Sequence, residues 1–192
     1  MIDDDQIYIV VDIETNGPVP GLYSMLSLGA VASSRSEELS SFYHKLAPLE
    51  DASQHPHNMT FWQQHPEAWQ EVTDNQESAQ TVIQDFVDWV KSFDKRPVFV
   101  SQPTAFDYAF VSWYLWKFTD NNPFLVQDGA SATLDLQSFI VGKHDLKLDM
   151  SRGEMLPEWM KQGMPEHSHN ALEDARGFGV ILRNVLNRES ES

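Results

Sequence analysis

Residues 6–17 read QIYIVVDIETNG, and this stretch decides the fold class. Isoleucine or valine recurs at every second position from Ile7 to Ile13, which is the spacing of a β-strand with one buried face. Val10 makes the other face apolar as well, as expected of a strand in the interior of a sheet. The turn residues TNGP at 15–18 then end the strand. The sequence therefore predicts a central strand over Gln6–Ile13.

The rest of the chain predicts strands and helices in a mixed order. Apolar runs at 25–32 and 40–46 follow after short loops, so we expect an antiparallel meander with the first strand. Residues 78–93 carry apolar side chains three and four positions apart, which is the spacing of a helix that packs on one face. The other elements expected are a short helix at 61–69, a strand at 97–100, a helix capped by Thr104 and running to 118, a short strand followed by a helix at 132–141, irregular chain at 142–168, and a helix at 170–188. This order predicts an α/β fold in which helices cover a mixed sheet.

Length and composition predict one globular domain. At about 150 residues per domain, the chain of 192 residues forms a single domain over 1–192. Hydrophobic residues make up 41% of the chain, which is typical of a protein with a packed core. Cysteine is absent, which excludes disulfides, zinc–thiolate sites, iron–sulfur clusters and cysteine nucleophiles. The last residues, ESES at 189–192, are expected to fray.

The chain is strongly acidic. Its 13 Lys and Arg residues against 29 Asp and Glu residues give a net charge of −16. Such a charge repels bulk polyanions, so we do not expect a protein that coats long duplex DNA, which needs a basic stripe. No apolar run approaches the roughly 18–20 residues of a membrane helix, and the acidic start MIDDDQ lacks a basic and apolar leader. We therefore expect a cytoplasmic protein with no membrane partner.

Asp12 and Glu14 form the first candidate site. They stand two positions apart on the predicted strand, so their side chains share one face with backbones roughly 6.5 Å apart. Two carboxylates at that separation repel by about 2.5 kcal/mol at an effective dielectric of 20, and a hard divalent cation such as Mg²⁺ removes this penalty. The alternative is a strand end whose acids are solvated.

Three more candidates stand at the starts of predicted helices. Asp107 lies in the first turn of the helix after the strand at 97–100, where an acid also complements the helix dipole. Asp174 lies in the first turns of the last helix, and His169 precedes its cap, Asn170. Five helical positions would turn the two side chains about 140° apart, so His169 can reach the same point as Asp174 only from the preceding loop. Each of these residues alone is also explained by helix capping.

Taken together, the motifs resemble a known family. IVVDIETNG at 9–17, SLGAV at 27–31, PTAFDYAFV at 103–111 and HNALEDA at 169–175 follow one another in this order. This combination resembles the DEDDh branch of the DnaQ-like 3′–5′ exonuclease superfamily, from Ile7 to Leu186. The resemblance implies a ribonuclease H-like fold, in which a mixed five-stranded sheet carries helices on both faces.

Two features depart from the family pattern. Pro103 stands where many proofreading relatives carry Asn, and SQPTAFD is more similar to a small bacterial exoribonuclease-like subgroup. The stretch NMTFWQQHPEAW at 58–69 has no counterpart in the minimal domain, which makes 48–75 a candidate insertion near the site. The histidines of this segment lack the regular spacing of a metal site and are expected in loops: His55, His57 and His65.

The resemblance implies a two-metal mechanism. Asp12, Glu14 and Asp174 would hold one Mg²⁺ or Mn²⁺ ion, and Asp12 would bridge to a second ion assisted by Asp107. Two such ions about 3.5–4 Å apart can stabilise both the attacking and the leaving oxygen at phosphorus. His169 would deprotonate the attacking water, since an imidazole titrates near neutral pH.

The same resemblance gives expected substrate contacts. Backbone N–H groups around Thr15 and Asn16 would hold the terminal sugar and phosphate. Met25 or Leu26 would wedge against the terminal base, and Phe106 would pack nearby, with core packing as the alternative for this ring.

The function expected is that of a metal-dependent 3′–5′ exonuclease. It would hydrolyse phosphodiester bonds at the 3′ end of single-stranded RNA or DNA and release nucleoside 5′-monophosphates. Two divalent ions add only +4 to the net charge of −16, so the protein with its metals would stay strongly anionic. Short oligonucleotides or single-stranded ends held at the metals are therefore favoured as substrates. The alternatives are an inactive nucleic-acid-binding module of the same fold and an endonuclease, and the resemblance is compatible with a homodimer.

Overall fold

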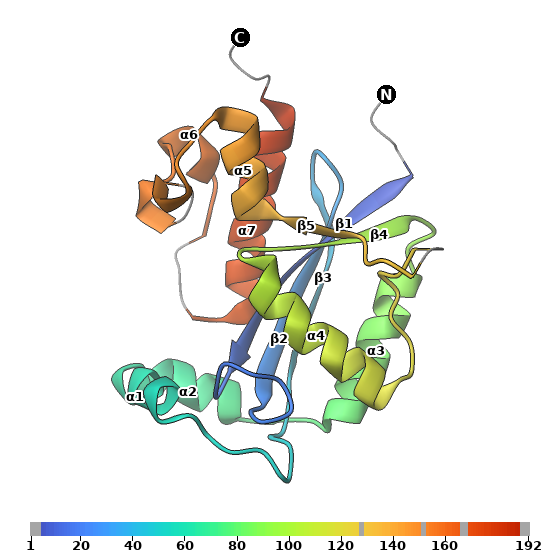
Figure 1. Cartoon of the computed structure of the whole chain (residues 1–192), viewed down its shortest axis with the longest axis vertical. Coiled ribbons are helices and arrows are strands. Elements are labelled where there is room, and N and C mark those ends of the chain that lie inside the picture. Colours follow the sequence, from blue (N-terminus) through green and yellow to red (C-terminus); the bar gives the residue numbers. More distant parts are fainter. Residues whose placement is uncertain (1–4, 127–128, 151–152, 166–168, 189–192) are drawn as a thin grey trace.

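The computed structural model describes residues 5–126, 129–150, 153–165 and 169–188, in which five strands form one sheet (Figure 1). The order across the sheet is β3-β2-β1-β4-β5, with β1 antiparallel to β2 and parallel to β4. This mixed sheet confirms the predicted fold class, and β1 is its central strand as expected. The strands are β1 (Gln6–Thr15), β2 (Met25–Ser33), β3 (Glu38–Lys45), β4 (Arg96–Ser101) and β5 (Thr133–Asp135).

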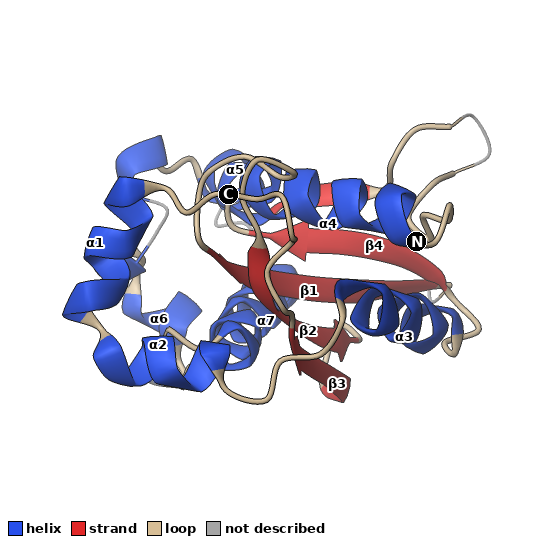
Figure 2. Ribbon diagram, turned by 90° about the horizontal axis from the view of Figure 1, so that it is seen from below, coloured by secondary structure: helices blue, strands red, loops and turns tan. Residues whose placement is uncertain are grey.

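The helices form two layers on the sheet and a separate pair at its end. α3 and α4 pack with one face in the larger core, and α5, α6 and α7 pack with the other face in a second core. Figures 1 and 2 show α1 and α2 side by side, near the end of the sheet at which β1 ends. Within the described residues, no helix combines the length and the hydropathy that crossing a bilayer requires. The helices are α1 (Pro56–Gln64), α2 (Pro66–Thr73), α3 (Ala79–Lys91), α4 (Thr104–Phe118), α5 (Leu136–His144), α6 (Glu158–Lys161) and α7 (Ala171–Asn187).

The alternation of residues along β1 decides which way its acids face. The odd-numbered residues from Ile7 to Ile13 are buried in the core beneath α3 and α4. Val10 is buried in the opposite core, with residues of α5, α6 and α7. Because side chains alternate between the two faces of a strand, Asp12 and Glu14 lie on the same face as Val10. The sheet thus turns both carboxylates toward α7.

Two expected elements differ in their limits. Residues 61–69 are not one helix, since α1 ends at Gln64 and α2 begins at Pro66. Pro66 has no N–H to donate to the preceding turn, so it starts a new helix instead of continuing the old one. The part of 142–168 that the structure describes is more regular than expected, because it holds the end of α5, two 3₁₀ turns and α6. The two turns span Leu148–Met150 and Gly153–Met155.

Gly29 on β2 permits a close approach of α7. Gly29 lies directly opposite Asp12 in the antiparallel pairing of β1 and β2. A Cβ atom at this position would lie 2.2 Å from the carbonyl carbon of Ala171 and 2.3 Å from the backbone N of Leu172. Only a residue without a side chain leaves room for the first turn of α7, which carries Asp174. The contact thus sets the distance between Asp174 and the acids of β1.

We therefore expect Gly29→Ala to move the start of α7 and to destabilise the protein. Overpacking a closed backbone contact costs about 1–3 kcal/mol, measurable by urea unfolding. Gly142→Ala is the matched control, because a Cβ atom at Gly142 in α5 has no neighbour within 4 Å. The control should be neutral or stabilising by up to about 1 kcal/mol. Equal stability of the two variants would show that α7 does not depend on the bare backbone of Gly29.

Candidate active site

Three carboxylates from two elements meet at one point of the structure. Asp12 and Glu14 on β1 and Asp174 in the first turn of α7 each place a carboxylate oxygen within 4.8 Å of the others. Asn170 caps α7 by accepting hydrogen bonds from the backbone N–H groups of Leu172 and Glu173. This cap fixes the start of the helix, and so the first turn with Asp174 is ordered as the sequence predicts.

Asp107 joins this group from α4. Its side chain is only 3% exposed, and its charge acts on both Asp12 and Glu14. The start of α4 is capped differently from the expectation. Pro103 occupies the cap position, while Thr104 donates its backbone N–H to Asp135 Oδ2 at 2.8 Å. A carboxylate at the end of β5 therefore fixes the turn that carries Asp107.

The electrostatics of the four acids are those of a repelling cluster. Burial, reinforced by the charges of Asp107, Glu14 and Asp174, raises the pKa of Asp12 well above its ordinary value. Burial and the charges of Asp174 and Asp107 raise the pKa of Glu14 to about 8. Burial raises the pKa of Asp107 to about 7, although the nearby Ser101 hydroxyl partly offsets the effect. A positive charge among these oxygens would oppose all three shifts, because an opposite charge nearby favours the ionised form of a carboxyl group.

The donor set fits a hard divalent cation. All the candidate ligands are carboxylate oxygens, which Mg²⁺ and Mn²⁺ prefer over nitrogen or sulfur ligands. The oxygens of Asp12, Glu14 and Asp174 are close enough to share one ion, and Asp107 lies beside them. The residues present therefore fit the divalent metal that the resemblance of the motifs implies.

His169 stands at the same end of α7, directly before the cap residue. Its φ of +53° is a left-handed conformation, which turns the chain sharply into the helix. Its ring packs edge-on against Phe61 at 5.1 Å and against His65 at 4.5 Å between ring centroids. The position in the preceding loop agrees with the expectation, and the neighbouring His167 lies outside the described residues.

The α1–α2 segment contacts this site, which sequence reasoning did not predict in detail. Trp62 in α1 is 2% exposed and donates its indole Nε1–H to the carbonyl of Thr15 at 3.0 Å. Glu71 in α2 accepts a hydrogen bond from the Tyr43 hydroxyl at 2.8 Å, and the charge of Glu71 contributes to the raised pKa of Glu14. In the sequence, this contact is indicated only by the high density of aromatic residues in NMTFWQQHPEAW.

The histidines of this segment are not all in loops. His57 lies within α1, and His65 lies at the junction of α1 and α2, where its Nδ1 is 2.9 Å from the carbonyl oxygen of Phe61. A carbonyl only accepts, so this nitrogen of His65 carries the proton. His55, directly before α1, packs edge-on against Tyr23.

The expected substrate contacts are mostly occupied by packing. Met25 and Leu26 are 0% exposed, so a wedge against a terminal base finds no exposed surface on either side chain. The Asn16 backbone N–H already donates to the carbonyl of Ser24, and Thr15 as a whole residue is only 6% exposed. Phe106 is half-buried and packs against Phe110, as the alternative interpretation had it.

Without divalent ions, the acidic cluster should make the stability of the protein fall as the pH rises. Folding raises the pKa of Glu14 from 4.5 to about 8, so between these values the unfolded chain has lost a proton that the folded chain keeps. The contribution of Glu14 to folding is therefore undiminished below about pH 4.5 and is lost by about pH 8. In EDTA at pH 9 we expect Glu14→Gln to be more stable than the natural chain by roughly 1–3 kcal/mol, with no difference near pH 4.

Urea unfolding at several pH values measures this difference. Addition of Mg²⁺ or Mn²⁺ should stabilise the natural chain at pH 8 and should stabilise Glu14→Gln much less, because a ligand is lost. Glu50→Gln, at an exposed position in a loop, is the control and should behave as the natural chain. A stability difference that does not change with pH would contradict the cluster as described.

Comparisons with known proteins agree with this geometry. The RNase T exonuclease family model matches residues 9–178. The 3′–5′ DNA exonuclease Cap18 of Escherichia coli is 31% identical over 201 residues, covering 100% of this chain and 97% of that protein.

Solved structures of exonucleases share the fold. A structure of exonuclease I has a TM-score of 0.70 at 16% identity, covering 95% of this chain and 41% of its own. The nuclease domain of 3′hExo, a DEDDh family member bound to rAMP, has a TM-score of 0.65 at 10% identity, covering 93% of this chain and 89% of its own. This chain thus spans about two-fifths of exonuclease I and nearly all of Cap18. The chain belongs to the RNase T exonuclease family, and it is a 3′–5′ exonuclease, as its motifs predict.

Proposed function

We propose that the protein shortens single-stranded DNA from its 3′ end and releases nucleoside 5′-monophosphates. The observation that carries the proposal is the meeting of Asp12, Glu14 and Asp174 within 4.8 Å, beside Asp107. DNA is favoured over RNA because the 31% identical relative is a DNA exonuclease by name, whereas the structures with RNA ligands share only the fold. RNA remains the other outcome of the substrate test.

The acids would hold the metal and the substrate phosphate together. Asp12, Glu14 and Asp174 would bind one Mg²⁺ or Mn²⁺ ion, and Asp107 with Asp12 would bind a second. When bound, the ions supply positive charge that stabilises the oxygens entering and leaving phosphorus. The rigid start of α7, which packs against Gly29, keeps Asp174 at the distance that a shared ion requires.

His169 would take the proton from the attacking water. Its ring is held on two sides by Phe61 and His65, so α1 and the α1–α2 junction restrict its orientation. His65 donates from its Nδ1 to the carbonyl of Phe61, so the Nε2 of His65 is the unprotonated nitrogen when the imidazole of His65 is neutral. The α1–α2 segment thus has a positioning role for the general base.

Replacement of Asp12 tests the metal assignment. Asp12→Asn keeps the size of the side chain and removes a ligand, so we expect loss of turnover by a factor of about 10³ or more with the fold intact. The assay follows the shortening of 5′-labelled single-stranded DNA and RNA of equal sequence, with Mg²⁺ or Mn²⁺, as a ladder of labelled products. Asp85→Asn on the exposed face of α3 is the charge-matched control. Unchanged activity of Asp12→Asn, or internal fragments in place of a 3′ ladder, would contradict the proposal.

Replacement of His169 tests the general base separately. His169→Ala should lower kcat by about 10²–10⁴, the usual contribution of a positioned base. Thermal stabilisation by Mg²⁺ should persist, because His169 is not proposed as a metal ligand. His57→Ala, at an exposed position in α1, is the control. A large loss of metal stabilisation in His169→Ala would place this residue among the ligands instead.

A further inference from the structure

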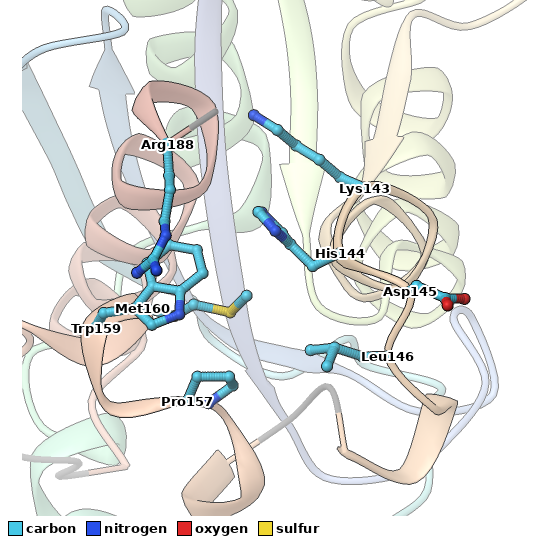
Figure 3. A pocket seen from close by; sticks show the side chains of 8 residues that line it. All are labelled: Lys143, His144, Asp145, Leu146, Pro157, Trp159, Met160 and Arg188. Atoms are coloured by element: carbon cyan, nitrogen blue, oxygen red, sulfur yellow. The ribbon is translucent and has the colours of Figure 1, made fainter. Parts of the chain in front are cut away.

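A cavity lies at the end of α7 that is remote from the acids. It has a volume of about 240 Å³ and lies between the end of α5, the start of α6 and the C-terminal end of α7 (Figure 3). Arg188 follows Asp174 by fourteen positions, so along the helix axis it lies about 21 Å away. The cavity is therefore distinct from the proposed metal site.

Basic side chains gather at this cavity although the protein is strongly acidic. Lys143, His144 and Arg188 all line it, and Figure 3 shows the first two extending toward the side that carries Arg188. Asp145 also lines it, but in Figure 3 its carboxylate points away from these nitrogens. Burial and the charge of Arg35 lower the pKa of Lys143, so another cation stands near it. An anion in the cavity would relieve this repulsion.

Capping of α7 explains only part of the arrangement. Lys143 Nζ donates to the carbonyl of Val185 at 2.6 Å, and Arg35 donates to the carbonyl of Leu186 at 2.7 Å. Both contacts complement the negative end of the helix dipole. Arg188, however, lies with its guanidinium carbon 4.2 Å from the ring centroid of Trp159, which holds it flat against α6.

The walls of the cavity are held in place. Asn184 in α7 donates from Nδ2 to the carbonyls of Met160 and Gln162, at 3.0 and 3.1 Å, and so fixes α6 to α7. The ring of His144 packs edge-on against Trp159 at 5.1 Å. These contacts hold the elements that carry the cationic side chains in fixed positions, as a binding site requires.

We propose that this cavity binds a nucleotide phosphate through Lys143, His144 and Arg188. The inference rests on the proposed function for the source of the ligand: either a phosphate of the substrate strand upstream of its 3′ end or the phosphate of a released mononucleotide. At about 3.4 Å per stacked nucleotide, a strand would cover the 21 Å to Asp174 with about six nucleotides. Arginine and lysine are the side chains that bind phosphate, and a local cationic site would hold the strand that the rest of the surface repels.

A binding experiment without turnover tests the cavity independently of the nuclease activity. In EDTA at low salt, the fluorescence anisotropy of 5′-fluorescein-dT12 reports binding, and dTMP is added as a competitor. We expect the double variant Lys143→Gln/Arg188→Gln to bind the labelled dT12 at least fivefold more weakly than the natural chain does. Lys91→Gln/Lys117→Gln, which removes two exposed lysines of α3 and α4, should have little effect. Because Lys143 also caps α7, Arg188→Gln alone is the second variant, and urea unfolding checks that each is folded.

Steady-state kinetics with Mg²⁺ distinguishes the two sources of phosphate. If the strand is the ligand, the KM for dT12 rises at least fivefold in the double variant, while kcat and the KM for dT3 stay the same. If a released mononucleotide is the ligand, dTMP stabilises the natural chain against heat and the double variant loses this effect without a change in KM. Failure of both dT12 and dTMP to bind the natural chain in EDTA, or equal binding by all variants, overturns the proposed cavity. Absence of turnover with intact binding would overturn the proposed function alone.

Discussion

The structure depends on bringing four carboxylates together against their mutual repulsion. The alternation of β1 turns Asp12 and Glu14 to one face, and the bare backbone of Gly29 lets Asp174 approach them. Asp107 arrives on a helix whose first N–H is held by Asp135 from the neighbouring strand. None of these contacts lowers the electrostatic cost, because each one shortens the distances between like charges. The folded protein therefore accepts a locally unfavourable arrangement that a divalent cation makes favourable.

Most of the fold could be read from hydrophobic periodicity, because burial on two faces of a sheet leaves a regular pattern in the chain. The limits of the helices depended on finer chemistry. Pro66 divides the expected helix at 61–69, and the cap of α4 comes from Asp135, which is distant in sequence. A capping residue that belongs to another element leaves no pattern in the sequence around the start of the helix. Sequence reasoning could therefore place Thr104 at the start of α4 but not identify what held it.

The geometry of the candidate site could be predicted to a similar extent. The acids and His169 stand in ordered motifs, whereas the contact of His169 with Phe61 and His65 depends on how the α1–α2 segment folds back. The expectation that Met25 or Leu26 contacts the terminal base shows what the sequence could not predict. Both are apolar residues beside the motif strand, and nothing in the sequence distinguishes an exposed apolar side chain from one that the core encloses. In the structure the core encloses both.

Along the chain, the α1–α2 segment lies between β3 and α3, whereas the proposed metal ligands come from β1, α4 and α7. It is joined to the end of β1 by the hydrogen bond from the Trp62 indole to the carbonyl of Thr15 and by the hydrogen bond from the His55 backbone N–H to the carbonyl of Asn16. Because Phe61 and His65 of this segment pack against His169, substitutions in it would change the surroundings of the proposed general base as well as the surface beside the acids. Residues of the α1–α2 segment and residues at the start of α7 would therefore have to change together for the packing around His169 to be kept.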